Sequence, residues 1–367
     1  MAKNIVLCCD GTANEFAKDK TNVLKLFVAL EQSDAQVTYY HPGLGTMEAP
    51  GALTPWQRQV STTFGLAFGA GLARDIAAAY IFLTRTYEAG DQVFLFGFSR
   101  GAYTARAVGS MLHLYGLIRP NNEAFVPYAI RMMLAIHRAQ EREQAVKEYF
   151  QLADDFRKTM TWTDCAPHFV GVWDTVSSIG WIENPLHLPY VSSNPDIAFG
   201  RHAVSIDERR AFFRTELWRP NVDPTKAGPK DLLQVWFPGV HCDVGGGYPE
   251  AESGLSKIPL GWMFREAKAQ GLLVNPLKER TVMGQIAGGA YAAPDVNGHL
   301  HESLSGVWQA AEFIPKKKYD WDSGKYIRAA NRGARRFIPA GSLVHRSAFD
   351  RAGDYSARLP ANVTKVD

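Results

Sequence analysis

The sequence is poor in cysteine, with 4 in 367 residues. Cys8 and Cys9 are adjacent, and Cys165 and Cys242 lie far from them and from each other. This arrangement fits neither a disulfide framework nor the paired spacing of a zinc knuckle. The cysteines therefore predict a protein of a reducing compartment. We also expect no metal centre and no cofactor.

Long hydrophobic runs are also missing. The least polar long segment, 64–83, has Arg74 and Asp75 at its middle, which is unfavourable for a membrane span. The amino terminus has one lysine and a run of five apolar residues before Asp10 interrupts it, too short for a signal peptide. We expect a cytoplasmic protein without a transmembrane segment, and peripheral membrane contact and contact-dependent export stay open.

The chain has no strong excess of either charge. Forty basic residues stand against thirty-seven acidic ones, and no basic run is interleaved with aromatic residues. This balance argues against a nucleic-acid partner. The short cluster Lys316, Lys317 and Lys318 is predicted to lie in a solvated loop. With 46% hydrophobic residues, the chain can bury a large core.

What the sequence does contain is an alternation of short apolar runs and amphipathic segments. Strands are predicted at 5–9, 37–40, 93–98, 168–173 and 234–237, the last of these being the final clear core strand. Helices are predicted at 22–32, 72–88, after residue 101, and at 260–270. This alternation is typical of an α/β fold with a mostly parallel central sheet flanked by helices. The Gly- and Pro-rich passage up to residue 71 is predicted to be a loop with short helical pieces.

The domain organisation follows from the same pattern. We expect a single domain over 1–367, with 119–167 forming a helical cap inserted after the nucleophile helix. Residues 271–367 are predicted to be an irregular extension packed on the core, with Trp308 and Trp321 against the body.

The most informative stretch surrounds Ser99. Gly97 and Gly101 lie two positions before and after it, between an apolar strand and a helical pattern. A sharp strand-to-helix turn needs small residues at these positions, and it pushes the hydroxyl at its apex out at the carboxyl edge of the sheet. The pattern G-x-S-x-G in this context predicts a nucleophile elbow; the alternative is a purely structural turn.

A nucleophilic serine needs a base and a group that orients the base. Asp174 ends an apolar strand, and His241 follows another, so the chain order is Ser, Asp, His. Asp207 and Asp243 are alternatives for the acid, and His345 and His301 for the base. The run around Asp207 looks more like a structural ion-pair cluster.

Two backbone N–H groups are needed for the developing oxyanion. Arg100, directly after the nucleophile, is one candidate donor. Gly11 or Thr12, in the loop after the first strand, is the other, with Asp10 holding the shape of that loop by accepting its amides. A pure turn role for Asp10 and Gly11 remains an alternative.

With these motifs assembled, the chain resembles the uncharacterised α/β-hydrolase family that includes the catalytic domain of type VI secretion phospholipase effectors. The resemblance extends from the first strand to about residue 270 and rests on six ordered segments: 7–14, 42–46, 94–106, 172–176, 206–210 and 237–248. It implies a serine esterase with Ser99 as nucleophile, Asp174 as acid and His241 as base. A weaker likeness covers Val344, His345 and residues 355–360.

The leading hypothesis is therefore a serine hydrolase of carboxylic esters, with phospholipids or other acyl lipids as candidate substrates, so its expected partner is a small-molecule or lipid ester. The alternative is a non-catalytic binding or scaffold protein on a hydrolase fold. An aspartyl phosphatase is disfavoured because Cys8 stands where the second aspartate would be. A metal site of Asp10, His241 and Asp243 lacks a recognisable ligand spacing.

Overall fold

A computed structural model describes residues 2–11, 20–43, 55–142, 146–176, 180–181, 184–185, 187–218, 228–306, 308–309, 312–313, 315–320 and 325–367. Thr12 and Trp321, both singled out in the sequence, lie outside these ranges.

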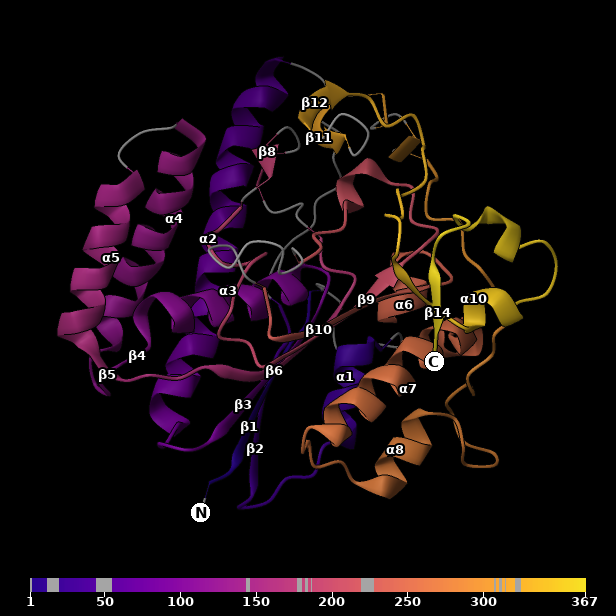
Figure 1. The fold of residues 1–367 in the computed structure, drawn as a ribbon, viewed down its shortest axis with the longest axis horizontal. Helices are drawn as coiled ribbons and strands as arrows, with labels where there is room; N and C mark the ends of the chain where they lie inside the picture. The colour runs from indigo at the N-terminus through magenta and orange to yellow at the C-terminus, as the bar shows by residue number, and fades with distance from the viewer. Residues whose placement is uncertain are drawn as a thin grey trace.

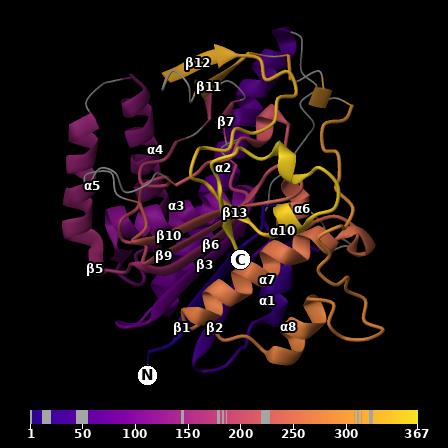
Figure 2. The ribbon, with the colours of Figure 1, turned by 45° about the vertical axis from the view of Figure 1, so that its right-hand side comes forward.

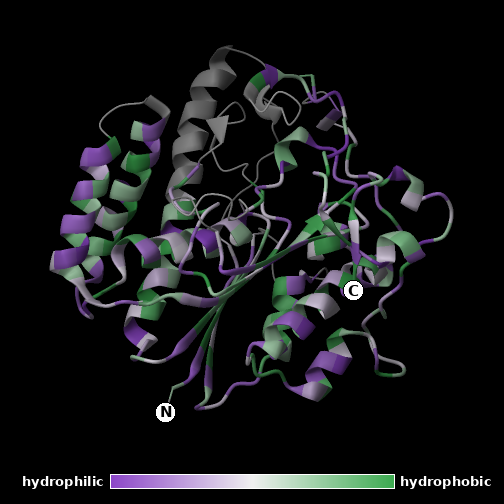
Figure 3. Cartoon of the chain, in the orientation of Figure 1, coloured by the Kyte–Doolittle hydropathy of each residue, from purple (hydrophilic) through white to green (hydrophobic). Residues whose placement is uncertain are grey.

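The central element is an eight-stranded sheet in the order β14-β13-β10-β9-β6-β3-β1-β2, and every neighbouring pair is parallel. Its strands are β1 (Asn4–Cys9), β2 (Gln36–His41), β3 (Gln92–Phe98), β6 (Pro167–Trp173), β9 (Phe199–Ser205), β10 (Asp231–Phe237), β13 (Leu343–His345) and β14 (Thr364–Val366). The apolar residues of β1 and β3 are buried on both faces, as strands in the middle of a parallel sheet must be. Figure 3 shows these middle strands as hydrophobic.

Helices cover both faces of the sheet (Figure 1). One face carries α2 (Pro55–Thr86), α3 (Arg100–Tyr115), α4 (Val126–Arg142) and α5 (Val146–Met160), and the other carries α1 (Asn22–Ala29), α7 (Gly254–Ala269) and α8 (Pro276–Val282). Two large hydrophobic cores result, one on each face, and a third, smaller cluster lies where β9, β10 and β13 meet the carboxyl-terminal segment. The predicted α/β-hydrolase-like fold is confirmed, and its sheet is entirely parallel. No helix within the described ranges is both long and apolar enough to cross a membrane.

The remaining elements are short. They include three antiparallel strand pairs: β4 (Leu117–Ile118) with β5 (Thr161–Thr163), β7 (Gly180–Trp181) with β8 (Asn184–Pro185), and β11 (Lys316–Asp320) with β12 (Lys325–Ala329). Short helices are α6 (His241–Gly245) and α10 (Ser347–Asp350), with 3-10 turns η1 (Glu123–Phe125), η2 (Ala211–Phe213), η4 (Glu250–Glu252) and η5 (Ser356–Arg358). The β11–β12 hairpin lies near the amino-terminal end of α2 in both ribbon views (Figure 2).

Several expectations about the sheet were wrong. Strand β10 is not the last core strand, because β13 and β14 of the supposedly irregular extension continue the sheet beyond it. Strand β9 was missed because its polar residues hide the apolar pattern. Arg201 is buried in this strand, and ion pairs with Asp231 and Glu266 compensate its charge. Tertiary pairing thus allows charged residues in a strand that the sequence pattern disfavours.

Two loop predictions also need correction. Helix α2 begins at Pro55 rather than near residue 72, and its early glycines conceal any helical period. Lys316, Lys317 and Lys318 lie in strand β11, paired antiparallel with β12, and not in a loop. Trp308 packs its ring 5.6 Å from that of Phe213, between centroids.

The segment predicted as a cap contains the helical hairpin α4–α5. Both helices pack against α3, and α4 also packs against α2. Their outward sides are largely hydrophilic (Figure 3). Whether this hairpin covers the site as a cap remains a prediction.

Candidate active site

The turn between β3 and α3 is packed too tightly for any side chain except hydrogen at its glycines. A Cβ on Gly97 would lie 2.4 Å from the carbonyl oxygen of Gly101, and one on Gly101 would lie 2.1 Å from that of Cys9. Gly11 likewise sits against the turn, since a Cβ there would lie 2.5 Å from the carbonyl oxygen of Phe98. The three glycines therefore let β1, β3 and α3 meet around Ser99.

Ser99 occupies the apex of this turn with φ of 57° and ψ of −120°. Such a backbone conformation is costly for a residue with a side chain and persists only where the surrounding structure imposes it. The N–H of Ser99 donates to the carbonyl oxygen of Trp173, 3.1 Å away, which joins the turn to the end of β6. Ser99 thus lies beside the strand end that carries Asp174.

Asp174 and His241 come together at the same edge of the sheet. The Nδ1 atom of His241 lies 2.5 Å from Oδ2 of Asp174, and both side chains are buried. The imidazole packs between two aromatic rings, with centroid distances of 4.6 Å to Phe98 and 4.7 Å to Phe213. Because Phe98 immediately precedes Ser99, this packing holds His241 next to the elbow.

The hydroxyl of Ser99 is not hydrogen-bonded to His241 in the part of the chain that the structure describes. Contacts of this kind are often long in enzymes without substrate and tighten when substrate binds. The structure therefore joins the acid and base candidates directly and places the serine candidate on the adjoining strand end.

The charge states of this pair follow from its surroundings. Burial alone would raise the pKa of Asp174, but the Arg336 guanidinium and the bond to His241 hold that pKa well below its usual range. Burial lowers the pKa of His241, and Asp174 opposes that shift without cancelling it. At neutral pH the acid is ionised and the imidazole is neutral, which is the state a general base needs.

Arg336, which the sequence reading did not single out, binds Asp174 through both ends of its guanidinium. Nη1 lies 2.5 Å from Oδ1 and Nη2 lies 3.0 Å from Oδ2. Nη1 also donates to Oγ of Ser205 at 2.7 Å, and Nη2 donates to the carbonyl oxygen of Phe213. No sequence signal marked this arginine, because 162 residues separate it from Asp174.

The run from Asp207 to Arg210 anchors the turn before α6, the short helix that His241 begins. Oε2 of Glu208 accepts from the N–H of His241 at 3.2 Å, and Arg210 binds both oxygens of Glu208 at 2.9 Å. Oδ2 of Asp207 accepts from the N–H of Gly239 at 2.8 Å and from the hydroxyl of Tyr355 at 2.5 Å. These carboxylates hold backbone in place, and no bond joins Asp207 to a histidine side chain among the described residues.

The other rivals are also occupied elsewhere. Asp243 accepts from the N–H of Val240 and pairs with Nδ1 of His301 at 2.6 Å, and Nε2 of His301 faces Glu252 at 2.9 Å. His345, at the end of β13, bonds to Ser347 through Nδ1 at 2.8 Å. Among the described residues no three His, Cys, Asp or Glu side chains gather as a metal-binding group.

The backbone N–H groups of Arg100 and Gly11, proposed as oxyanion donors, lie in different surroundings. Arg100 begins α3, so its N–H lies at the amino end of that helix, and its guanidinium donates to the carbonyl oxygen of Gly11 at 2.7 Å. The N–H of Gly11 donates to Oδ1 of Asp10 at 2.8 Å and is therefore already engaged. Oδ2 of Asp10 accepts from the hydroxyls of Thr21 and Tyr40. Asp10 thus ties the loop after β1 to α1 and β2.

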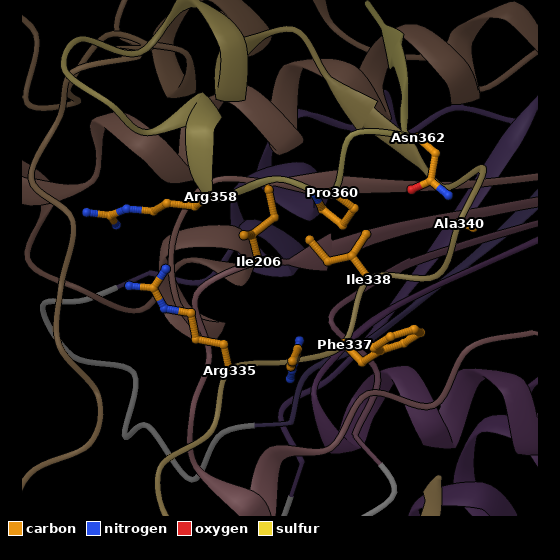
Figure 4. Close-up of a pocket in the computed structure, with 9 residues that line it drawn as sticks. Ile206, Arg335, Phe337, Ile338, Ala340, Arg358, Pro360 and Asn362 are labelled. Atoms are coloured by element: carbon orange, nitrogen blue, oxygen red, sulfur yellow. The ribbon is translucent and has the colours of Figure 1, made fainter. Parts of the chain in front are cut away.

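A pocket of about 340 Å³ opens beside this network, between the end of β9 and the carboxyl-terminal segment. Figure 4 shows Arg335 and Arg358 along one side of it and Asn362 at the opposite end. Arg336 lines the same pocket. The pocket therefore borders the arginine that binds Asp174.

Comparison with known proteins identifies the family. Residues 3–266 match the Tle1-like catalytic domain of type VI secretion phospholipase effectors. The chain belongs to this family. The resemblance inferred from the six sequence motifs is confirmed, and Arg336 lies beyond the matched residues.

Individual relatives are more distant. The chain is 33% identical over 229 residues to the uncharacterized protein YEL023C of Saccharomyces cerevisiae, a match that covers 59% of this chain and a third of that protein's length. An uncharacterized protein from Pseudomonas aeruginosa is similar in structure, with 19% identity, a TM-score of 0.44, and coverage of 74% of this chain and 46% of that one. The Tle1 effector, solved bound to the VgrG spike of the type VI secretion system, is also similar in structure. Its sequence identity is 17% and its TM-score 0.36, and the match covers 69% of this chain and 52% of that one.

Proposed function

We propose that this protein is a serine hydrolase that cleaves carboxylic esters of phospholipids or other acyl lipids. Ser99 is the nucleophile, His241 the general base and Asp174 the residue that orients the base. The observation that carries the proposal is the bond from His241 Nδ1 to Asp174 Oδ2, located beside the strained turn at Ser99. Membership of a family named for phospholipase effectors supports a lipid ester as substrate.

The proposed mechanism proceeds in two stages. Nε2 of His241 accepts the proton of the Ser99 hydroxyl while Oγ attacks the ester carbonyl carbon, and the imidazolium then gives that proton to the departing alcohol. Water, deprotonated by the same imidazole, attacks the acyl-serine. The bond to Ser99 Oγ then breaks as the imidazolium returns the proton to that oxygen, and the carboxylic acid is released. The N–H of Arg100, directly after the nucleophile, is the proposed donor to the oxyanion.

Labelling by a fluorophosphonate probe tests this proposal, together with hydrolysis of p-nitrophenyl esters and a phospholipid panel of graded chain length. We expect the wild-type protein to be labelled and Ser99→Ala to lose both labelling and turnover. Ser356→Ala, which changes an exposed serine, is the control and is expected to keep both. Turnover by Ser99→Ala at the wild-type rate would refute the mechanism, and a wild-type protein without any esterase activity would favour the binding-protein alternative.

A further inference from the structure

The carboxylate of Asp174 receives more donors than orienting one imidazole requires. Oδ1 accepts from the N–H of Ser205 at 3.0 Å and from Nη1 of Arg336, and Oδ2 accepts from His241 and from Nη2 of Arg336. The Arg336 side chain is only 8% exposed, and its charge is compensated here by Asp174. A carboxylate that served packing alone would not need a bidentate cationic partner.

We propose that Arg336 is a positioning residue of the catalytic site. It fixes the plane of the Asp174 carboxylate, and it reduces the stabilisation that this carboxylate gives to a protonated His241. The proposal rests on the proposed serine hydrolase mechanism and extends it. It gives the segment after residue 266, which lies beyond the matched family domain, a role in catalysis.

The first element of the role is geometric. Two parallel N–H···O bonds from one planar guanidinium hold a carboxylate in a single orientation, which a lysine ammonium cannot do. The guanidinium is itself fixed by Ser205 Oγ and by the carbonyl oxygens of Ser205 and Phe213. Since Phe213 also packs on the imidazole, the same contacts set acid and base relative to each other.

The second element is electrostatic. A positive charge on both oxygens of Asp174 reduces the stabilisation that this carboxylate gives to an imidazolium at His241. The other charged groups that face His241 are Glu208, which favours the imidazolium, and Arg210, which opposes it. His202 and Cys242 also face the pair but stay neutral at pH 7, because burial lowers the pKa of His202 to about 3 and raises that of Cys242 to about 12. Loss of Arg336 should therefore make His241 more basic.

The test compares Arg336→Gln and Arg336→Lys with Arg335→Gln. The control removes the same charge from the neighbouring arginine, which lines the same pocket but is exposed. For each folded variant we measure kcat and KM of ester hydrolysis and the pH dependence of kcat/KM. We expect both Arg336 variants to lose kcat by about tenfold to a hundredfold, with KM nearly unchanged, by analogy with residues that orient the ligands of a catalytic metal.

The pH profile separates positioning from mere stability. In Arg336→Gln the acid limb of kcat/KM should move to higher pH, and in Arg335→Gln it should stay at the wild-type position. A proton NMR signal of the bond between His241 and Asp174 gives a readout that needs no turnover. We expect that signal to shift or broaden in the Arg336 variants and to stay unchanged in Arg335→Gln.

Rescue provides a check if Arg336→Gln does not fold. Arg336→Ala leaves a gap that opens on the pocket, so millimolar ethylguanidinium should restore part of kcat, while ethylammonium should not. The proposal is overturned if folded Arg336 variants match Arg335→Gln in kcat and acid limb, or if no guanidinium rescues activity. A wild-type protein that neither labels at Ser99 nor turns over esters would instead reject the underlying function, with the NMR signal still reporting on Arg336.

Discussion

Glu208 offers a stability prediction whose size can be worked out from its contacts. Its side chain is fully buried, and its two oxygens accept six hydrogen bonds, from the N–H groups of Arg209, Arg210 and His241, from the hydroxyl of Ser303, and twice from the Arg210 guanidinium. Burial raises the pKa of Glu208, but Arg210, together with Arg336 and His241, outweighs burial and lowers the pKa from 4.5 to about 2.

That lowered pKa translates into free energy of unfolding. At about 1.4 kcal/mol for each pH unit, the ionised Glu208 contributes about 3 kcal/mol at pH 7. Because the pKa is lower in the folded state than in the unfolded state, this contribution is present above pH 4.5 and is lost as the pH falls toward 2. By pH 3.5 about 1.4 kcal/mol of it should be gone.

Glu208→Gln removes the charge and replaces one acceptor oxygen by a donor amide. We expect urea denaturation at pH 7 to show a loss of about 3 kcal/mol in the free energy of unfolding, also because Arg210 loses its buried partner. The gap between wild type and variant should narrow to about 2 kcal/mol at pH 3.5.

The matched control is Glu302→Gln, which disrupts an ion pair with Arg209 at the surface. It should change the free energy of unfolding by less than about 1 kcal/mol at pH 7. A gap for Glu208→Gln that stays constant from pH 7 to pH 3.5, or one no larger than that of the control, would refute the reasoning.

Two further predictions concern the packing of helix α3 and a buried hydrogen bond of Tyr355. On helix α3, Gly101→Ala should destabilise the fold by about 3 kcal/mol because its Cβ would lie 2.1 Å from a carbonyl oxygen. Gly109→Ala, whose Cβ would make ordinary contacts from 3.5 Å, should stabilise it by about 0.5–1 kcal/mol; thermal melts that give both changes the same sign would contradict this. Tyr355→Phe removes the bond to buried Asp207 and should cost about 1–3 kcal/mol in urea denaturation, whereas a change as small as that of exposed Tyr149→Phe would count against the role of that hydroxyl.

Local pattern was enough to predict the frame of this molecule. Strands β1, β3 and β6 are continuous apolar runs because both of their faces are buried, and such runs are visible in a sequence without any knowledge of contacts. The glycines around Ser99 are equally local, since each relieves a clash within the turn or with the neighbouring strand. The residues at the ends of these strands were therefore identifiable as site candidates.

Elements stabilised by distant partners could not be found in this way. Strand β9 carries Arg201 and His202 inside the sheet, and the charge of Arg201 is tolerated there because it forms two ion pairs, with residues on β10 and α7. Strands β13 and β14 have three residues each, too few for a periodic signal, and they exist because β10 offers a free edge. The sequence reading accordingly ended the sheet too early.

The candidate site likewise combines features that local sequence predicts with contacts that form only when the chain folds. The sequence by itself determined the strand-to-helix turn at Ser99 and the presence of an aspartate and a histidine after later strands, because parallel strands bring their carboxyl ends to one edge. Only the tertiary structure decided that His241 pairs with Asp174 rather than Asp207 or Asp243, and that Arg336 binds the same carboxylate. Hydrogen bonds and ion pairs act over a few ångströms of space, whatever the separation along the chain, so their partners are chosen when the chain folds.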